Sequence, residues 1–150
     1  MPTNYTELFQ KIETMVRANP EHLLLRICEI LKQEVYHYDW VGFYILDPDK
    51  NELFLGPYIG KSTEHTNIPV GKGICGQVAE KAEAMIVQDV TQVENYLACS
   101  LDVQSEIVVP VLKDGRFVAE LDIDSHSPAP FRNEDLFFLT KICDLLADCF

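Results

Sequence analysis

Hydrophobic residues recur at helical spacing near both ends of the chain. The first such stretch covers residues 4–18, a second follows Asn19-Pro20, and a third follows Asn133. Apolar positions three and four residues apart on one face indicate amphipathic helices. Asn4, with Glu7 three residues later, is typical of a helix N-cap, Pro20 is expected to open the second helix, and Asn133 can cap the last one. The chain is therefore expected to begin with two helices and to end with one.

Between these helices, the pattern changes to one typical of strands. Residues 40–46 are rich in aromatic and β-branched side chains, and a turn cluster at 47–51 predicts that residues 52–58 pair back as a hairpin. Residues 105–113 and 116–124 flank Asp114-Gly115, a strong short-range hairpin signal. Hairpin-linked strands imply an antiparallel sheet. We expect an α+β fold with the terminal helices on one face of this sheet and a ligand pocket under loops on the other.

The middle of the chain predicts shorter elements. Residues 68–70 and 85–87 are candidate short strands, and residues 76–81 suit a short helix after the Gly71-Lys-Gly73 break. Residues 88–104 lack a clear period and are expected to form a long loop, a kind of segment that is often functional.

Length and charge narrow the class of protein. The 150 residues fit one domain, residues 1–150, and no apolar run approaches the roughly 20 residues of a membrane span. The first residues do not resemble a signal peptide, so we expect a cytoplasmic protein without a membrane partner. A net charge of −12, from 12 basic and 24 acidic residues, disfavours nucleic-acid binding.

The chain has five cysteines. An odd number without a secretory signal argues against a structural disulfide framework. No CxxC pair and no His/Cys spacing typical of zinc is present, so no metal site is predicted. Cys28 and Cys143 accompany the apolar helix faces and are expected in the core, whereas Cys149 is expected near the surface. This leaves Cys75 and Cys99 as the candidate reactive thiols.

The two candidate thiols lie in different settings. Cys99 falls in the predicted long loop near Asp102 and Glu106, where it is either a reactive thiol or an inert loop cysteine. Cys75 lies between glycines at the start of a short helix, whose N-terminus would favour a thiolate. The adjoining Gly71-Lys-Gly73 lacks the full phosphate-binding pattern, so phosphate binding is not expected.

Acidic and aromatic pairs share strand faces. Asp122 and Asp124 lie two residues apart and therefore point the same way. They can hold a cation, a metal or an ammonium group, donate a proton from a raised pKa, or simply mark a strand end in solvent. Trp40 and Tyr44 also share a face, where they either wall a pocket for a methylthio group or fill the core.

Taken in order, five segments resemble the free methionine-(R)-sulfoxide reductases, a family of GAF domains. They are Gly71-Lys-Gly-Ile-Cys75-Gly76, Asp89-Val90, Ala98-Cys99, residues 105–110 and residues 121–125, and the resemblance extends from about Trp40 to the last helix. It implies a single GAF domain without a cofactor that reduces free L-methionine-(R)-sulfoxide. It also implies a cysteine sulfenic acid intermediate, thioredoxin as the reductant, and a homodimer.

The same resemblance assigns roles to residues. Cys99 matches the catalytic cysteine, and Cys75 matches a second family cysteine that would join it in catalysis. Glu106, Asp122 and Asp124 match the acids that surround the ammonium and sulfoxide groups of the substrate, and Glu106 would also take part in catalysis. Trp40 and Tyr44 match the aromatic residues of the substrate pocket.

One position departs from the family pattern. Family members often carry a recycling cysteine ten residues before the position of Cys75, where this chain has His65. The alternative function is a non-catalytic GAF module that uses the same pocket to sense a small molecule.

Overall fold

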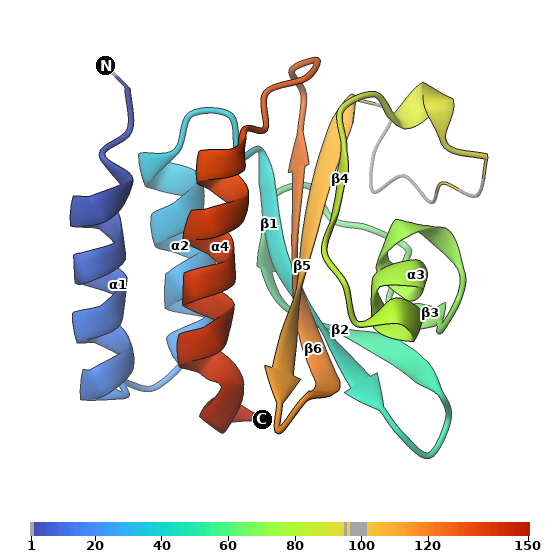
Figure 1. The fold of residues 1–150 in the computed structure, drawn as a ribbon, viewed down its shortest axis with the longest axis horizontal. Helices are drawn as coiled ribbons and strands as arrows, with labels where there is room; N and C mark the ends of the chain where they lie inside the picture. Colours follow the sequence, from blue (N-terminus) through green and yellow to red (C-terminus); the bar gives the residue numbers. More distant parts are fainter. Residues whose placement is uncertain (1, 95, 97–101) are drawn as a thin grey trace.

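A six-stranded antiparallel sheet forms the centre of the molecule (Figure 1). The computed structural model describes residues 2–94, 96 and 102–150. In the sheet, the strand order is β3-β2-β1-β6-β5-β4. The strands are β1 (Trp40–Asp47), β2 (Glu52–Ile59), β3 (Asn67–Pro69), β4 (Met85–Val87), β5 (Ser105–Lys113) and β6 (Arg116–Ser125). The helices are α1 (Tyr5–Ala18), α2 (Leu23–Glu34), α3 (Gly73–Lys81) and α4 (Asn133–Leu146), with short 3-10 turns at Val90–Gln92 and Ala147–Cys149. The predicted α+β fold is confirmed.

The starts of the helices confirm one of the predictions made from local sequence and contradict others. Asn4 Oδ1 accepts a hydrogen bond of 3.1 Å from the Glu7 N–H, as the N-cap prediction requires. The prediction for Pro20 is wrong, because α2 begins at Leu23, after His22 takes a left-handed backbone conformation with φ 57°. The last helix contains Asn133 as its first residue rather than as its cap.

The helices α2 and α4 pack on one face of the sheet, and α1 lies on their outer side (Figure 1). Successive residues of a strand point to opposite faces, and in β6 the residues Ala119, Leu121 and Ile123 point into the core beneath these helices. Cys28 and Cys143 are buried in this same core, as predicted. None of the helices in the described part of the chain is long and apolar enough to cross a membrane.

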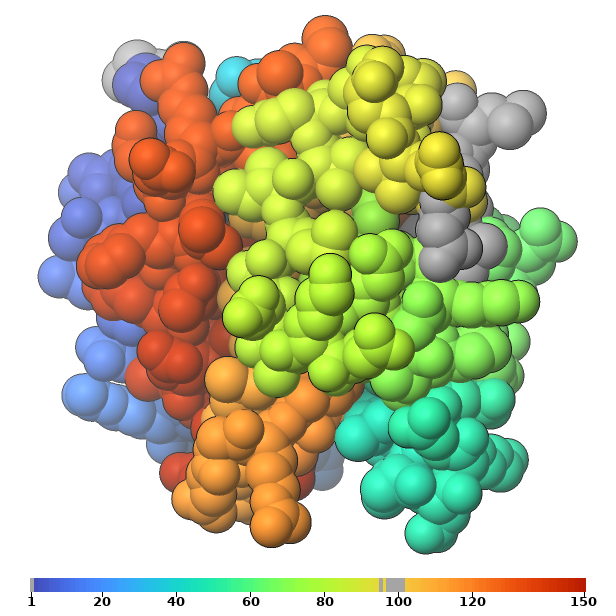
Figure 2. Space-filling view, turned by 45° about the vertical axis from the view of Figure 1, so that its right-hand side comes forward, coloured from blue at the N-terminus to red at the C-terminus, as the bar shows by residue number. Residues whose placement is uncertain are grey.

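The opposite face is covered by α3 and the segments around it, which lie at the front of the molecule in Figure 2. A smaller apolar cluster there includes Tyr44 of β1, Val108 of β5 and Ile74 of α3. The helix α3 approaches β3 closely because Gly76 has no side chain: a Cβ at this position would lie 2.7 Å from the Pro69 carbonyl oxygen. The helix begins at Gly73, earlier than predicted.

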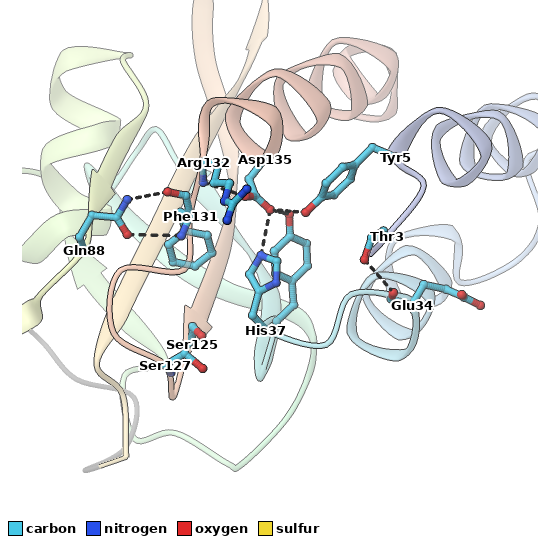
Figure 3. Close-up of polar contacts among 11 residues, drawn as sticks. Thr3, Tyr5, Glu34, His37, Gln88, Ser125, Ser127, Phe131, Arg132 and Asp135 are labelled. Carbon is cyan, nitrogen blue, oxygen red and sulfur yellow. Dashed lines mark hydrogen bonds and ion pairs between the residues drawn. The ribbon is translucent and has the colours of Figure 1, made fainter. Parts of the chain in front are cut away.

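A buried carboxylate ties α4 to the start of the chain (Figure 3). Asp135 Oδ1 accepts hydrogen bonds of 2.7 Å from both the Tyr5 and the Tyr38 hydroxyls, and it lies 3.0 Å from His37 Nε2. Its second oxygen accepts from the Arg132 N–H at 2.8 Å, which caps the first turn of α4. One side chain thereby joins α1, the turn before β1 and α4.

The loop after β4 is attached to the same region (Figure 3). The Gln88 side-chain amide donates a hydrogen bond of 2.6 Å to the Phe131 carbonyl oxygen and accepts one of 3.3 Å from the Phe131 N–H. The N–H of Ala129 also donates to the Gln88 carbonyl oxygen at 3.1 Å. These contacts fix the point at which the chain leaves the sheet toward the predicted long loop.

Candidate functional site

Four acidic side chains lie buried on the face of the sheet opposite α1, α2 and α4. Glu106 comes from β5, and Glu120, Asp122 and Asp124 alternate along β6; their exposed fractions are 3%, 0%, 1% and 0%. The strand register places Glu106 opposite Asp124. Because Asp122 and Asp124 are buried, the interpretation of a strand end in solvent is wrong.

Sequence reasoning missed Glu120. The signal was available, because a residue two positions before Asp122 must share its face of a strand. Its apolar neighbours Ala119 and Leu121 point into the core beneath the helices, and Glu120 faces the other way. The acidic face of β6 is therefore one residue longer than predicted.

Cys75 lies against this acidic face. It is the third residue of α3 and is 7% exposed. Its Sγ lies 3.9 Å from Glu106 Oε2, and ligand atoms of Cys75, Glu106 and Asp122 all lie within 4.8 Å of one another. The helix α3 and the β5–β6 hairpin, which are distant from each other in sequence, thus bring a thiol and two carboxyl groups together.

A small cavity adjoins these groups. Its volume is about 10 Å³, room for about one water-sized sphere. It is lined by Tyr44, His65, Ile68, Lys72, Gly73, Ile74, Cys75, Glu106 and Asp122. A larger groove of about 750 Å³ lies between α2, β2 and the C-terminal residues. We place the candidate site at the small cavity because it carries the buried acids and the thiol, whereas the acid in the groove, Asp148, is exposed.

Burial dominates the electrostatics of the site. It raises the pKa of the Glu120 carboxyl well above its usual range and also raises that of Asp122. Burial likewise raises the pKa of the Cys75 thiol, and the nearby carboxyl groups of Asp122, Glu120 and Glu106 raise it further. The predicted helix N-terminus effect, which would favour a Cys75 thiolate, is outweighed. Burial therefore stabilises the protonated, neutral forms of the Cys75 thiol and of the Glu120 and Asp122 carboxyl groups.

The predicted aromatic pair holds a loop beside the cavity. The Tyr44 hydroxyl donates a hydrogen bond of 2.8 Å to the His65 carbonyl oxygen, and Trp40 Nε1 donates one of 3.0 Å to the Lys61 carbonyl oxygen. The Trp40 ring stacks on Tyr44 and on Tyr58, with centroid distances of 6.4 and 5.3 Å. Tyr44 lines the cavity directly, and Trp40 lies behind it on the same sheet face.

The predicted nucleophile, Cys99, lies outside the described residues. The segment resumes at Asp102, whose carboxylate forms an exposed ion pair with the Lys61 ammonium group. The chain just after the predicted nucleophile is thereby linked to the loop that Trp40 and Tyr44 hold. The position of Cys99 relative to the acids stays a prediction.

The described groups define what this site can do chemically. A group of buried carboxyl side chains favours a bound cation, which an ammonium group or a metal ion can supply. A carboxyl group that burial keeps protonated can also donate a proton near neutral pH. Asp122 has both properties, because it lines the cavity and has a raised pKa.

Comparisons with known proteins identify the family of the chain. The GAF domain family matches residues 19–149. The chain is 35% identical to "GAF domain-containing protein A" of Dictyostelium discoideum, across 95% of this chain and 89% of that protein. It is 31% identical to the free methionine-R-sulfoxide reductase of Escherichia coli, across 87% and 79% of the two chains. The structure of the free methionine-R-sulfoxide reductase of Neisseria meningitidis in complex with its substrate matches with a TM-score of 0.89 and 36% identity, covering 96% and 86% of the two chains.

Proposed function

We propose that this chain, which belongs to the GAF-domain family of free methionine-R-sulfoxide reductases, reduces the free R-sulfoxide of methionine. The observation that carries the proposal is the acidic face of β5 and β6, where four carboxyl groups are buried beside a cavity and a thiol. A free amino acid has an α-ammonium group that such a face attracts. A methionine within a peptide lacks this charge, which gives a physical reason for preferring the free amino acid.

In the proposed reaction, the Cys99 thiolate attacks the sulfur atom of the sulfoxide. The sulfoxide oxygen must be protonated before it passes from the methionine sulfur to the cysteine sulfur, so that one S–O bond breaks as the other forms. A buried carboxyl group supplies that proton. Asp122 and Glu106 both line the cavity, and general acid catalysis by such a group typically contributes about 10² to 10⁴-fold. The products are methionine and a sulfenic acid on Cys99, so the sulfoxide is reduced as the thiol is oxidised.

Recycling of the sulfenic acid needs a reductant. A thioredoxin dithiol supplies two electrons, which returns Cys99 to the thiol and releases water, leaving a disulfide on thioredoxin. Two routes are open to it: direct attack on Cys99, or reduction of a Cys75–Cys99 disulfide. The raised pKa of the Cys75 thiol favours the direct route, because the protonated thiol is a poor nucleophile.

Substrate entry requires the walls of the cavity to move apart. The described side chains leave about 10 Å³, which holds one water-sized sphere, and methionine sulfoxide is many times larger. Loop contacts such as the exposed Lys61–Asp102 ion pair are weak enough to open. We expect hydrogen exchange in residues 60–72 to change when the substrate binds.

The test compares Cys99→Ser with Cys149→Ser, a matched change at an exposed cysteine away from the site. Reduction of free methionine-R-sulfoxide with thioredoxin should vanish in the first variant and persist in the second, while circular dichroism shows the same fold in both. Full activity in Cys99→Ser would refute the nucleophile. A substrate-dependent rise in melting temperature of the unaltered protein without any turnover would instead favour the small-molecule sensor.

A further inference from the structure

We propose that Cys75, Glu106 and Asp122 form a binding site for a thiophilic divalent cation of the zinc type. The ligands would be the Cys75 sulfur and one carboxylate oxygen from each acid, with a fourth position open to water. The site stands on the described geometry and does not require the chain to be a reductase.

The geometry of the three side chains fits such an ion. Their ligand atoms lie within 4.8 Å of one another, and the Sγ–Oε2 distance between Cys75 and Glu106 is 3.9 Å. Tetrahedral zinc with Zn–S of about 2.3 Å and Zn–O of about 2.0 to 2.2 Å places neighbouring ligands roughly 3.5 Å apart. Small side-chain rotations therefore close the set around an ion. The three backbones are held by α3, β5 and β6, so the set is rigidly supported.

A second observation points to a ligand. No hydrogen bond of ordinary geometry reaches either carboxyl oxygen of Asp122 from the described residues, although this side chain is 1% exposed. The carboxyl oxygens of Glu120, two residues before it on β6, are likewise buried and receive no such hydrogen bond from the described residues. Buried polar groups in proteins are normally paired. Against the larger effect of burial, Glu106 and the Cys75 thiol lower the pKa of Asp122, and the Cys75 thiol lowers that of Glu120. A cation bound by the Cys75 sulfur and the Asp122 carboxylate would satisfy Asp122.

The size and chemistry of the cavity select the ion. A volume of about 10 Å³ admits one ion or one water-sized sphere. A thiolate with two carboxylates suits zinc and its soft analogue cadmium, whereas magnesium prefers six oxygen ligands and retains its waters. Binding converts the Cys75 thiol to a metal-bound thiolate and releases its proton, and it also releases the proton that burial favours on Asp122, because both groups bind the ion in their deprotonated forms; no oxidation state changes.

Zinc bound here would exclude the amino acid. Glu106 and Asp122 are the acids that line the cavity, so the same carboxylates would serve either the metal or the substrate's ammonium group. This consequence rests on the proposed function. It makes zinc a reversible competitive inhibitor that a chelator removes.

The direct test is a cadmium titration of Cys99→Ser, a background in which a thiolate signal cannot come from the predicted nucleophile. We expect an ultraviolet sulfur-to-cadmium charge-transfer band that saturates at one ion per chain and is unaffected by excess magnesium. Adding Cys75→Ser should abolish the band, and adding Asp122→Asn should weaken cadmium binding about tenfold or more. The matched controls Cys149→Ser and Asp114→Asn, at the C-terminus and at the tip of the β5–β6 hairpin, should leave it unchanged.

A band that survives the loss of Cys75, or that excess magnesium removes, would overturn the site. X-ray absorption of the zinc-loaded, unaltered protein gives a check that needs no variant: one sulfur with oxygen ligands is expected, and a shell without sulfur contradicts the proposal. In the reductase assay, zinc should raise KM without lowering kcat, and a fall in kcat alone would contradict the shared carboxylates. Cadmium binding through Cys75 in a protein that never reduces the sulfoxide would refute the proposed function and leave the metal site standing.

Discussion

Replacing Asp135 by asparagine should destabilise the fold although the side chain hardly changes in volume. Burial alone would raise the pKa of this carboxyl, but hydrogen bonds from His37, Tyr38 and Tyr5, with a further one from the Arg132 N–H, lower it to about 2. Its exposed fraction is 2%, so solvent screens these contacts little. Asp135→Asn keeps the shape and removes the charge.

The magnitude follows from the pKa. An unfolded aspartate titrates near 3.9, so a folded pKa of about 2 represents about 2.5 kcal/mol of stabilisation at neutral pH. In asparagine, the oxygen can still accept from the tyrosine hydroxyls, but the amide nitrogen that replaces the second oxygen cannot accept from the Arg132 N–H. The loss of this hydrogen bond adds about 1 kcal/mol to the destabilisation. We expect Asp135→Asn to lower the free energy of unfolding by about 2 to 4 kcal/mol. In a chain of this size, that lowers Tm by about 5 to 15 °C.

The sign of the pH dependence makes the test specific. The folded pKa lies below the unfolded one, so the ionised carboxylate stabilises the fold above about pH 4, and this contribution is lost as the pH falls toward 2. Urea unfolding followed by circular dichroism at several pH values should therefore show a large difference between parent and variant at pH 7 that shrinks on acidification. A difference below about 1 kcal/mol at pH 7, or one independent of pH, would refute the reasoning.

Two further variants test the other face of the sheet. Glu120→Gln should be more stable than the parent at neutral pH and equally stable below about pH 4. Burial raises the pKa of Glu120 in the folded state, so the parent loses about 1.4 kcal/mol of stability for each pH unit above the unfolded pKa, until the pH reaches the folded pKa. Paired urea titrations check this, and equal stability at pH 8 would contradict it. Gly42→Ala should cost about 1 to 3 kcal/mol, because its Cβ would lie 2.5 Å from the Trp40 ring and 2.7 Å from Tyr58 Cβ. Tryptophan fluorescence during unfolding measures this loss of stability. The control is Gly115→Ala, at a residue with φ +77° and open space around it, which should leave the Trp40 spectrum unchanged. An unaltered spectrum in Gly42→Ala would count against the close contact.

Local signals predicted the elements that depend on local contacts. The N-cap at Asn4, the Asp114-Gly115 hairpin and the alternation of β6 were all predictable, because each depends on residues within a few positions of one another. The start of α4 was not, because its cap comes from Asp135, a side chain inside the helix whose orientation is fixed by distant tyrosines.

The site was predictable only in part, for a similar reason. The acids of β6 share a face by the period of the strand, so Asp122 and Asp124 were placed together, and Glu120 could have been added. The contact of Cys75 with Glu106 depends on how closely α3 packs on the sheet, which no spacing along the chain encodes. Absence of a zinc-like spacing was therefore a weak argument against a metal, since the three candidate ligands come from three separate elements.

The alternation along β6 also constrains how this protein can change over evolutionary time. Apolar residues anchor α4 and its neighbours on one side, and from Glu120 to Asp124 every second residue is an acid on the other. Inserting or deleting a single residue in this strand would point the carboxyl groups into the apolar core and the core residues toward the cavity. Length variation should therefore accumulate in the hairpin tip and the loops, while the acidic face can diversify only through substitutions in place.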